Sequence, residues 1–99
     1  MLKTMSFDQK QIADFCRRHH IRKLAFFGSV LGDDFGPDSD IDVLVEFEPG
    51  HTPGLAFIRM QDELSEILGG RQVDLVTKEF LNYRIRDQIL EDMNVVYAQ

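Results

Sequence analysis

The segment Asp40-Ile41-Asp42 is the part of this sequence best suited to chemistry. Residues two apart in an extended strand point the same way, so Asp40 and Asp42 are expected to present two carboxylates on one face. Carboxylates this close repel, and each raises the pKa of the other unless a cation lies between them. Mg²⁺ typically binds one or two protein carboxylates and completes its shell with water and substrate phosphate. The pair therefore predicts a metal site.

Two further motifs supply groups that can bind phosphate and a third carboxylate for the metal site. Gly28-Ser29 ends an apolar run, where backbone N–H groups and a hydroxyl at a helix start can grip phosphate oxygens. Asp74 lies in Val73-Asp74-Leu75-Val76, where a charge inside an apolar strand is costly unless it is paired. If its strand neighbours that of Asp42, three carboxylates can hold two metals for an in-line displacement at phosphorus.

Other interpretations of these residues fit the sequence less well than a metal site. Alone, Asp40 and Asp42 would fit a solvated turn before a strand. An EF-hand beginning at Asp38 fails, because Val43 stands where glycine is needed and Pro49 where glutamate is needed. A P-loop fails for want of Gly-Lys-Ser/Thr. The three histidines show no spacing that suggests zinc ligands: His19, His20 and His51.

Composition limits the classes of function. A chain of 99 residues is expected to form one domain spanning residues 1–99. A net charge of −6, with no Lys or Arg between Leu24 and Ile58, argues against direct nucleic-acid binding. The N-terminus lacks an apolar leader and no run would span a bilayer, so a cytoplasmic protein with no membrane contact is expected. Cys16, the single cysteine, is expected to be a buried thiol.

The elements that must position these residues follow from periodicity and turn signals. Ser6 and Gln9 form a capping-box signal for the first helix. We expect an α+β fold, with a small mixed sheet and helices packed mainly on one face. The last helix is apolar on more than one face, which favours contact with another protein. The predicted elements are a helix at 7–19, a strand at 23–27, a short helix from Val30, a strand at 40–47, a helix at 55–68, a strand at 72–77, a helix at 78–92 and an extended segment at 95–97.

Together these motifs resemble the minimal nucleotidyltransferases of the polymerase-β-like superfamily, the antitoxins of HEPN/nucleotidyltransferase toxin–antitoxin pairs. The resemblance covers nearly the whole chain and centres on residues 27–45 and 73–76. It implies the nucleotidyltransferase fold. In that fold Gly28 and Ser29 would bind the phosphates of ATP, and Asp40, Asp42 and Asp74 would coordinate Mg²⁺, with two ions accompanying bound ATP. It also implies transfer of AMP to a tyrosine of a HEPN-domain ribonuclease toxin, which neutralises the toxin.

One departure from the family pattern leaves alternatives open. Members commonly carry arginine where this sequence has Gly32. Either another cation neutralises the triphosphate, or catalysis is weakened and the antitoxin acts by direct binding of the toxin. Transfer to RNA or a small molecule, as in larger relatives, is disfavoured by the acidic charge and the absence of a further domain. The cations considered as substitutes are Arg71, Lys78, Arg84 and a side chain of the partner.

Overall fold

The computed structural model describes residues 7–31 and 39–99, which fold around a four-stranded mixed sheet with strand order β3-β2-β1-β4. β1 pairs antiparallel with β2 and with β4, whereas β2 and β3 run parallel and are connected through α2. This confirms the predicted α+β class with a mixed sheet. The strands are β1 (Ile21–Phe27), β2 (Ile41–Phe47), β3 (Val73–Thr77) and β4 (Asn94–Ala98).

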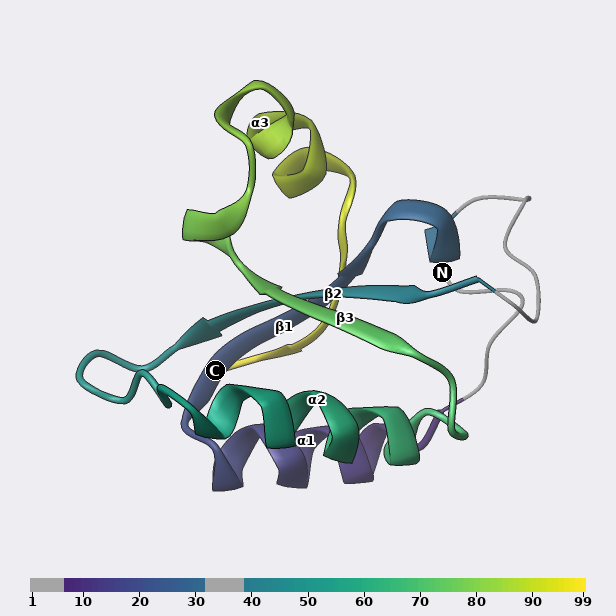
Figure 1. Cartoon of the computed structure of the whole chain (residues 1–99), viewed down its shortest axis with the longest axis vertical. Helices are drawn as coiled ribbons and strands as arrows, with labels where there is room; N and C mark the ends of the chain where they lie inside the picture. The colour runs from purple at the N-terminus through teal and green to yellow at the C-terminus, as the bar shows by residue number, and fades with distance from the viewer. Residues whose placement is uncertain (1–6, 32–38) are drawn as a thin grey trace.

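The helices are distributed unequally over the two faces of the sheet (Figure 1). Helix α1 (Gln9–Arg18) and helix α2 (Ala56–Ile67) lie side by side beneath one face. Helix α3 (Tyr83–Asp92) lies on the other side and buries none of its residues. Two short 3₁₀ helices, η1 (Gly28–Leu31) and η2 (Lys78–Phe80), follow β1 and β3. No helix in the described ranges combines the length and apolar character needed to cross a membrane.

The hydrophobic core lies between the sheet and the pair α1 and α2. Alternate residues of β2 (Ile41, Val43 and Val45) belong to this core and are fully buried. Phe15 of α1 and Leu64 of α2 pack against them from the helical layer. Because strand side chains alternate, the residues between them, Asp42 among these, face the opposite side of the sheet. The core therefore fixes which face of the sheet is free for chemistry.

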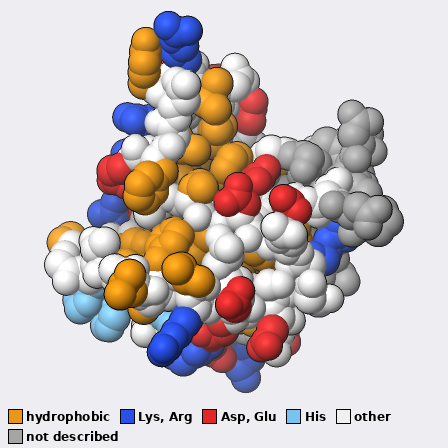
Figure 2. All heavy atoms as spheres, viewed as in Figure 1, with side chains coloured by type: hydrophobic (Ala, Val, Ile, Leu, Met, Phe, Trp, Pro, Cys, Tyr) orange, Lys and Arg blue, Asp and Glu red, His pale blue; other side chains and the backbone are white. Residues whose placement is uncertain are grey.

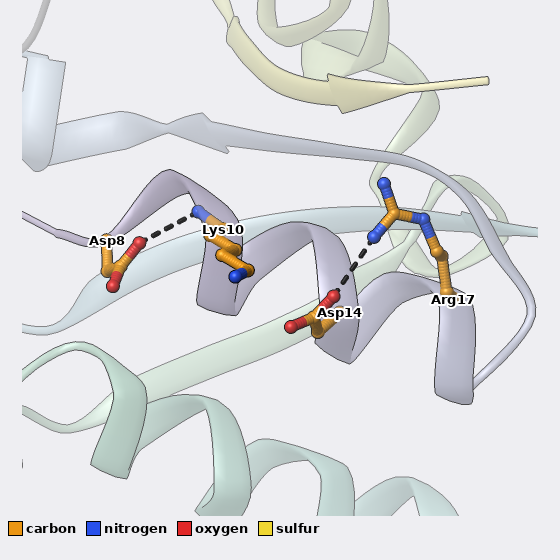
Figure 3. Close-up of polar contacts among 4 residues, drawn as sticks. All are labelled: Asp8, Lys10, Asp14 and Arg17. Carbon is orange, nitrogen blue, oxygen red and sulfur yellow. Dashed lines mark hydrogen bonds and ion pairs between the residues drawn. The ribbon is translucent and has the colours of Figure 1, made fainter.

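The start of α1 differs from the prediction. The helix begins at Gln9, and its N-cap is Asp8, whose carboxylate accepts a hydrogen bond of 2.9 Å from the backbone N–H of Lys10 (Figure 3). The predicted cap Ser6 lies outside the described residues. An aspartate closer to the apolar positions satisfies the same unpaired N–H groups, which is why the helix begins two residues later than predicted. Figure 3 also shows the surface ion pair between Asp14 and Arg17, one turn apart.

The last helix also begins later than predicted. Residues 78–80 form the 3₁₀ helix η2, Leu81 is extended, and α3 starts at Tyr83. The side chain of Asn82 accepts a hydrogen bond of 2.9 Å from the N–H of Arg84, so Asn82 caps a new helix. The predicted extended segment at 95–97 is confirmed as part of β4, which pairs with β1 at the edge of the sheet.

The helical layer gives a direct test of where stability resides. Leu64→Ala removes a fully buried side chain of α2 and is expected to lower the free energy of unfolding by about 2–5 kcal/mol. Ile58→Ala, in the same helix at a position 66% exposed, is expected to change it by less than about 0.5 kcal/mol. Urea unfolding followed by circular dichroism measures both. Equal losses in the two variants would contradict this placement of the core.

Candidate functional site

The register of the sheet places the predicted acidic residues together. In the parallel pairing of β2 with β3, Asp42 lies directly opposite Asp74. Asp40 comes immediately before β2, and Phe27, the last residue of β1, pairs with Asp42 from the other side. The strand order therefore brings three carboxylates from two segments, more than 30 residues apart in the chain, to one edge of the open face.

The surface view agrees with this placement. Figure 2 shows acidic side chains gathered near the centre of the visible face, next to hydrophobic side chains. Asp40 and Asp74 are exposed and Asp42 is partly buried. The condition set for Asp74, that its strand should neighbour that of Asp42, is confirmed by the pairing of β3 with β2. β3 alternates, with Val73 and Leu75 buried toward the helices, so Asp74 points to the open face.

Gly28 lies directly against the carboxylate of Asp42. Its φ of +75° belongs to the left-handed region that glycine adopts without strain. A Cβ atom at this position would lie 2.3 Å from Oδ2 of Asp42, well inside van der Waals contact. Glycine is therefore required twice, by its backbone angle and by the close approach. The result is that the turn after β1, which leads into η1, borders the carboxylates.

The electrostatics of the site centre on Asp42. Its pKa is raised above the ordinary value of 3.8, first by loss of hydration and then by the negative charges of Asp74 and Asp40. Within residues 7–31 and 39–99, no Lys, Arg or His forms an ion pair with Asp42 or Asp74. The fold therefore holds the negatively charged carboxylates of Asp42, Asp74 and Asp40 close together. A cluster of carboxylate oxygens of this kind suits a hard divalent cation.

The other residues predicted to bind phosphate lie at different places in the fold. Ser29 follows Gly28 within η1, whereas Gly32 lies outside the described residues. Of the cations proposed to replace the family arginine, only Arg71 is shown close to the site, because its guanidinium donates a 3.2 Å hydrogen bond to the carbonyl of Ser39, next to Asp40. Lys78 lines a groove at the other end of β3, and Arg84 stacks over Tyr83 on α3.

Comparison with known proteins identifies similar sequences and folds. The family model of the nucleotidyltransferase domain matches residues 9–96. Protein adenylyltransferase MntA of Thermococcus cleftensis is 40% identical over 82 residues, covering 82% of this chain and 78% of the relative. A solved structure provisionally described as a minimal nucleotidyltransferase superposes with a TM-score of 0.71 at 35% identity, covering 86% of this chain and 85% of the other. A toxin–antitoxin crystal structure with AMP-PNP shares the fold, with a TM-score of 0.73 at 19% identity over 93% of this chain and 74% of the other.

Replacing Asp42 by a neutral isostere should stabilise the metal-free protein. In Asp42→Asn the repulsion toward the facing Asp74 is lost, and the free energy of unfolding is expected to rise by roughly 0.2–1 kcal/mol. A raised pKa means that the charged form is disfavoured in the folded state. The gain should therefore be absent below pH 3.8, grow as pH rises from 3.8 to the raised pKa, and be constant above it. Urea unfolding in EDTA across this pH range measures it.

Asp62→Asn is the matched control for that experiment, because Asp62 is an exposed carboxyl on α2, away from the cluster. It is expected to shift stability by less than about 0.5 kcal/mol at every pH. A loss of stability in Asp42→Asn near neutral pH would show that the carboxylates do not repel one another in the fold.

The close approach of Gly28 to Asp42 predicts that a side chain at position 28 weakens nucleotide binding. Gly28→Ala and Gly54→Ala both place alanine at positive φ, which should cost each variant about 1 kcal/mol of stability. Only at Gly28 does the new Cβ meet a side chain, since nothing lies within 4 Å of a Cβ at Gly54. Isothermal titration is therefore expected to show Mg²⁺·ATP binding at least about tenfold weaker in Gly28→Ala alone. Equal weakening in both variants would contradict a role for this contact.

Proposed function

We propose that the chain, which belongs to the nucleotidyltransferase domain family, transfers AMP from ATP to a tyrosine of a HEPN-domain ribonuclease toxin and so neutralises it. The observation that carries the proposal is the pairing of Asp42 with Asp74, with Gly28 packed against Asp42. The relative named as a protein adenylyltransferase and the related toxin–antitoxin fold support both the reaction and the kind of partner.

Asp40, Asp42 and Asp74 would hold Mg²⁺, with two ions accompanying ATP. Their oxygens match the ligands that Mg²⁺ prefers, and their mutual repulsion supplies a reason for a cation to bind. When bound, the metal would supply charge neutralisation of the triphosphate and polarisation of the reacting oxygens. Gly28 and Ser29 would contact the phosphates through backbone N–H groups and the serine hydroxyl, since a glycine turn permits a phosphate to approach the backbone closely.

The reaction that fits this site is an in-line displacement at the α-phosphorus. The tyrosine oxygen forms a bond to phosphorus, the bond to the pyrophosphate oxygen breaks, and the phenolic proton leaves to solvent or to a carboxylate of the site. Because Asp74 faces the open side of the sheet, an acceptor side chain from a second protein can approach the carboxylates without rearrangement of the core. An exposed site of this kind suits a protein acceptor.

A partner surface is available next to β3 and β4. Apolar side chains of η2 and α3 are exposed, namely Phe80 at 78%, Tyr83 at 72% and Ile85 at 51%. A helix that buries none of its own residues while exposing aromatic and aliphatic groups is typical of an element that packs on another subunit. These residues support η2 and α3 as the region that contacts the toxin.

A second function rests on Gly32, which stands where the family commonly carries arginine. With a weakened phosphate contact, the chain would act as an antitoxin by binding the toxin directly, without turnover. Arg71 argues against that alternative, because its contact with the Ser39 carbonyl keeps a guanidinium close to the acidic cluster. The two functions differ in whether the carboxylates are needed for neutralisation.

The test is transfer of label from α-labelled ATP, with Mg²⁺, to the co-encoded toxin. The Asp40→Asn/Asp42→Asn variant is expected to lose transfer by at least about 100-fold, because the metal ligands are removed while the fold is kept. Asp62→Asn serves as the control with one exposed carboxyl removed and should label at the wild-type rate. Peptide mass spectrometry should place the added AMP on a tyrosine.

The same samples separate the two functions. Ribonuclease activity of the toxin is measured after incubation with the wild type and with the double variant. Inhibition by the wild type alone supports adenylylation. No label on the toxin, together with equal inhibition by a folded double variant, would overturn the enzymatic proposal in favour of direct binding.

A further inference from the structure

A second cluster of potential metal ligands lies at the opposite end of the β1–β2 hairpin from the acidic site. It consists of His20, which precedes β1, and of Glu48 and His51, which follow β2. One ligand atom from each of these residues lies within 4.8 Å of the others. A seven-residue strand separates this end of the hairpin from Gly28, a distance of about 20 Å. The cluster is therefore independent of the nucleotide site.

We propose that His20, Glu48 and His51 form a binding site for Zn²⁺. Two imidazoles and one carboxylate are a donor set that zinc accepts in proteins, leaving a further position for water. Nitrogen donors favour zinc over Mg²⁺, which prefers oxygen ligands. The site would thus select a different metal from the acidic cluster of the same chain.

Main-chain hydrogen bonds hold the backbones of the three ligand residues next to one another before any metal binds. The N–H of Glu48 donates to the carbonyl of His20 at 2.8 Å, and the N–H of His51 donates to the carbonyl of Glu48 at 3.0 Å. Each ligand is thereby tied to the next by a main-chain hydrogen bond. Oε2 of Glu48 accepts a 2.6 Å hydrogen bond from Gln99, whereas Oε1 faces Nδ1 of His20 at 3.9 Å. Such support of a ligand by an outer hydrogen bond is typical of metal sites.

The backbone angle of His20 gives a second, independent reason. Its φ of 57° makes it the one non-glycine residue with positive φ in the described ranges, at the position just after the C-cap of α1. Glycine is the usual residue there, and histidine is one of the few other residues enriched at positive φ, although the conformation is uncommon for it. Residues held in an unfavourable backbone conformation occur often at functional sites, where the side chain has a role in binding or catalysis.

The side chains are free to reorganise around an ion. The rings of His20 and His51 are stacked, with centroids 3.9 Å apart and planes at 16°. Zinc binding requires the ring nitrogens to converge, so the stack must open by rotation of the two side chains. The side chain of His20 is 52% exposed, which allows that rotation without disturbing the core.

Competing zinc ligands in the described part of the chain are poorly placed. Burial raises the pKa of the Cys16 thiol to about 12, so its thiolate is not available. His19 already contacts Glu63 at 2.9 Å, and Arg18 pairs with the same carboxylate. His19 is therefore a natural control, one residue from His20 and also beside a glutamate.

The test is isothermal titration of ZnCl₂ into untagged, EDTA-treated and dialysed full-length protein. Wild type and His19→Asn are expected to bind one zinc ion with micromolar affinity. His20→Asn and His51→Asn are expected to bind at least tenfold more weakly. His20→Asn should remain folded and be about as stable without metal, because asparagine, like histidine, is enriched at positive φ. Zinc at a given concentration should raise the Tm of the wild type more than that of His20→Asn.

The titrations support or overturn the zinc site formed by His20, Glu48 and His51. Tenfold selective loss in the His20 and His51 variants supports the site. Equal zinc affinity in all four chains, loss in His19→Asn as large as in His20→Asn, or no binding by the wild type would overturn it. MgCl₂ titrated in place of ZnCl₂ should give the same heats for wild type and His20→Asn, which separates this site from the acidic cluster.

Discussion

The repulsion between Asp42 and Asp74 is the constraint around which the rest of this structure is arranged. The parallel register of β2 and β3 places the two carboxylates opposite each other. Loss of hydration raises the pKa of Asp42, and the charges of Asp74 and Asp40 raise it further. Hydrophobic burial beneath the sheet must offset this cost. Since the repulsion would disappear with a single neutral substitution, its presence is best explained by a bound cation that reverses its sign.

The fold supplies the geometry for this arrangement with few residues. The core under α1 and α2 fixes β1 and β2 as an antiparallel pair, and the α2 crossover returns β3 parallel to β2. That order brings the end of β1 and the starts of β2 and β3 to the same edge. Gly28 then allows the turn after β1 to touch Asp42, whereas a Cβ at this position would displace the Asp42 carboxylate. A phosphate chain bound to the turn would thus lie beside the carboxylates.

Much of this could be predicted from the sequence, for identifiable reasons. The strand and helix patterns were strong enough to predict the α+β class. The face on which Asp42 lies follows from strand alternation alone, whereas Asp40 lies just before β2 and outside that alternation. Element boundaries failed where two capping signals competed: Asp8 caps α1, and Asn82 starts a separate helix after η2. The exposure of Asp74 does not follow from its apolar neighbours in the sequence, because only the sheet shows that one of its faces is open there.

The histidine cluster shows what sequence spacing cannot reveal. His20 and His51 are separated by a whole β-hairpin, and only the antiparallel pairing of β1 with β2 brings them together. Local spacing therefore gave no sign of a ligand set. The hairpin carries an oxygen-rich cluster at one end and a mixed nitrogen and oxygen cluster at the other, so the two ends differ in the metal that each would favour.

The most direct test of the central claim is to locate the divalent cation that accompanies the nucleotide. Mn²⁺, added at a small fraction of the protein concentration with a non-hydrolysable ATP analogue, broadens the amide resonances of nearby residues in ¹⁵N-labelled protein. Broadening is expected to be strongest at Gly28, Asp42 and Asp74 and to be lost in Asp42→Asn. Broadening centred elsewhere on the chain, or unchanged in that variant, would contradict the account that these carboxylates are held together to bind a metal–nucleotide complex.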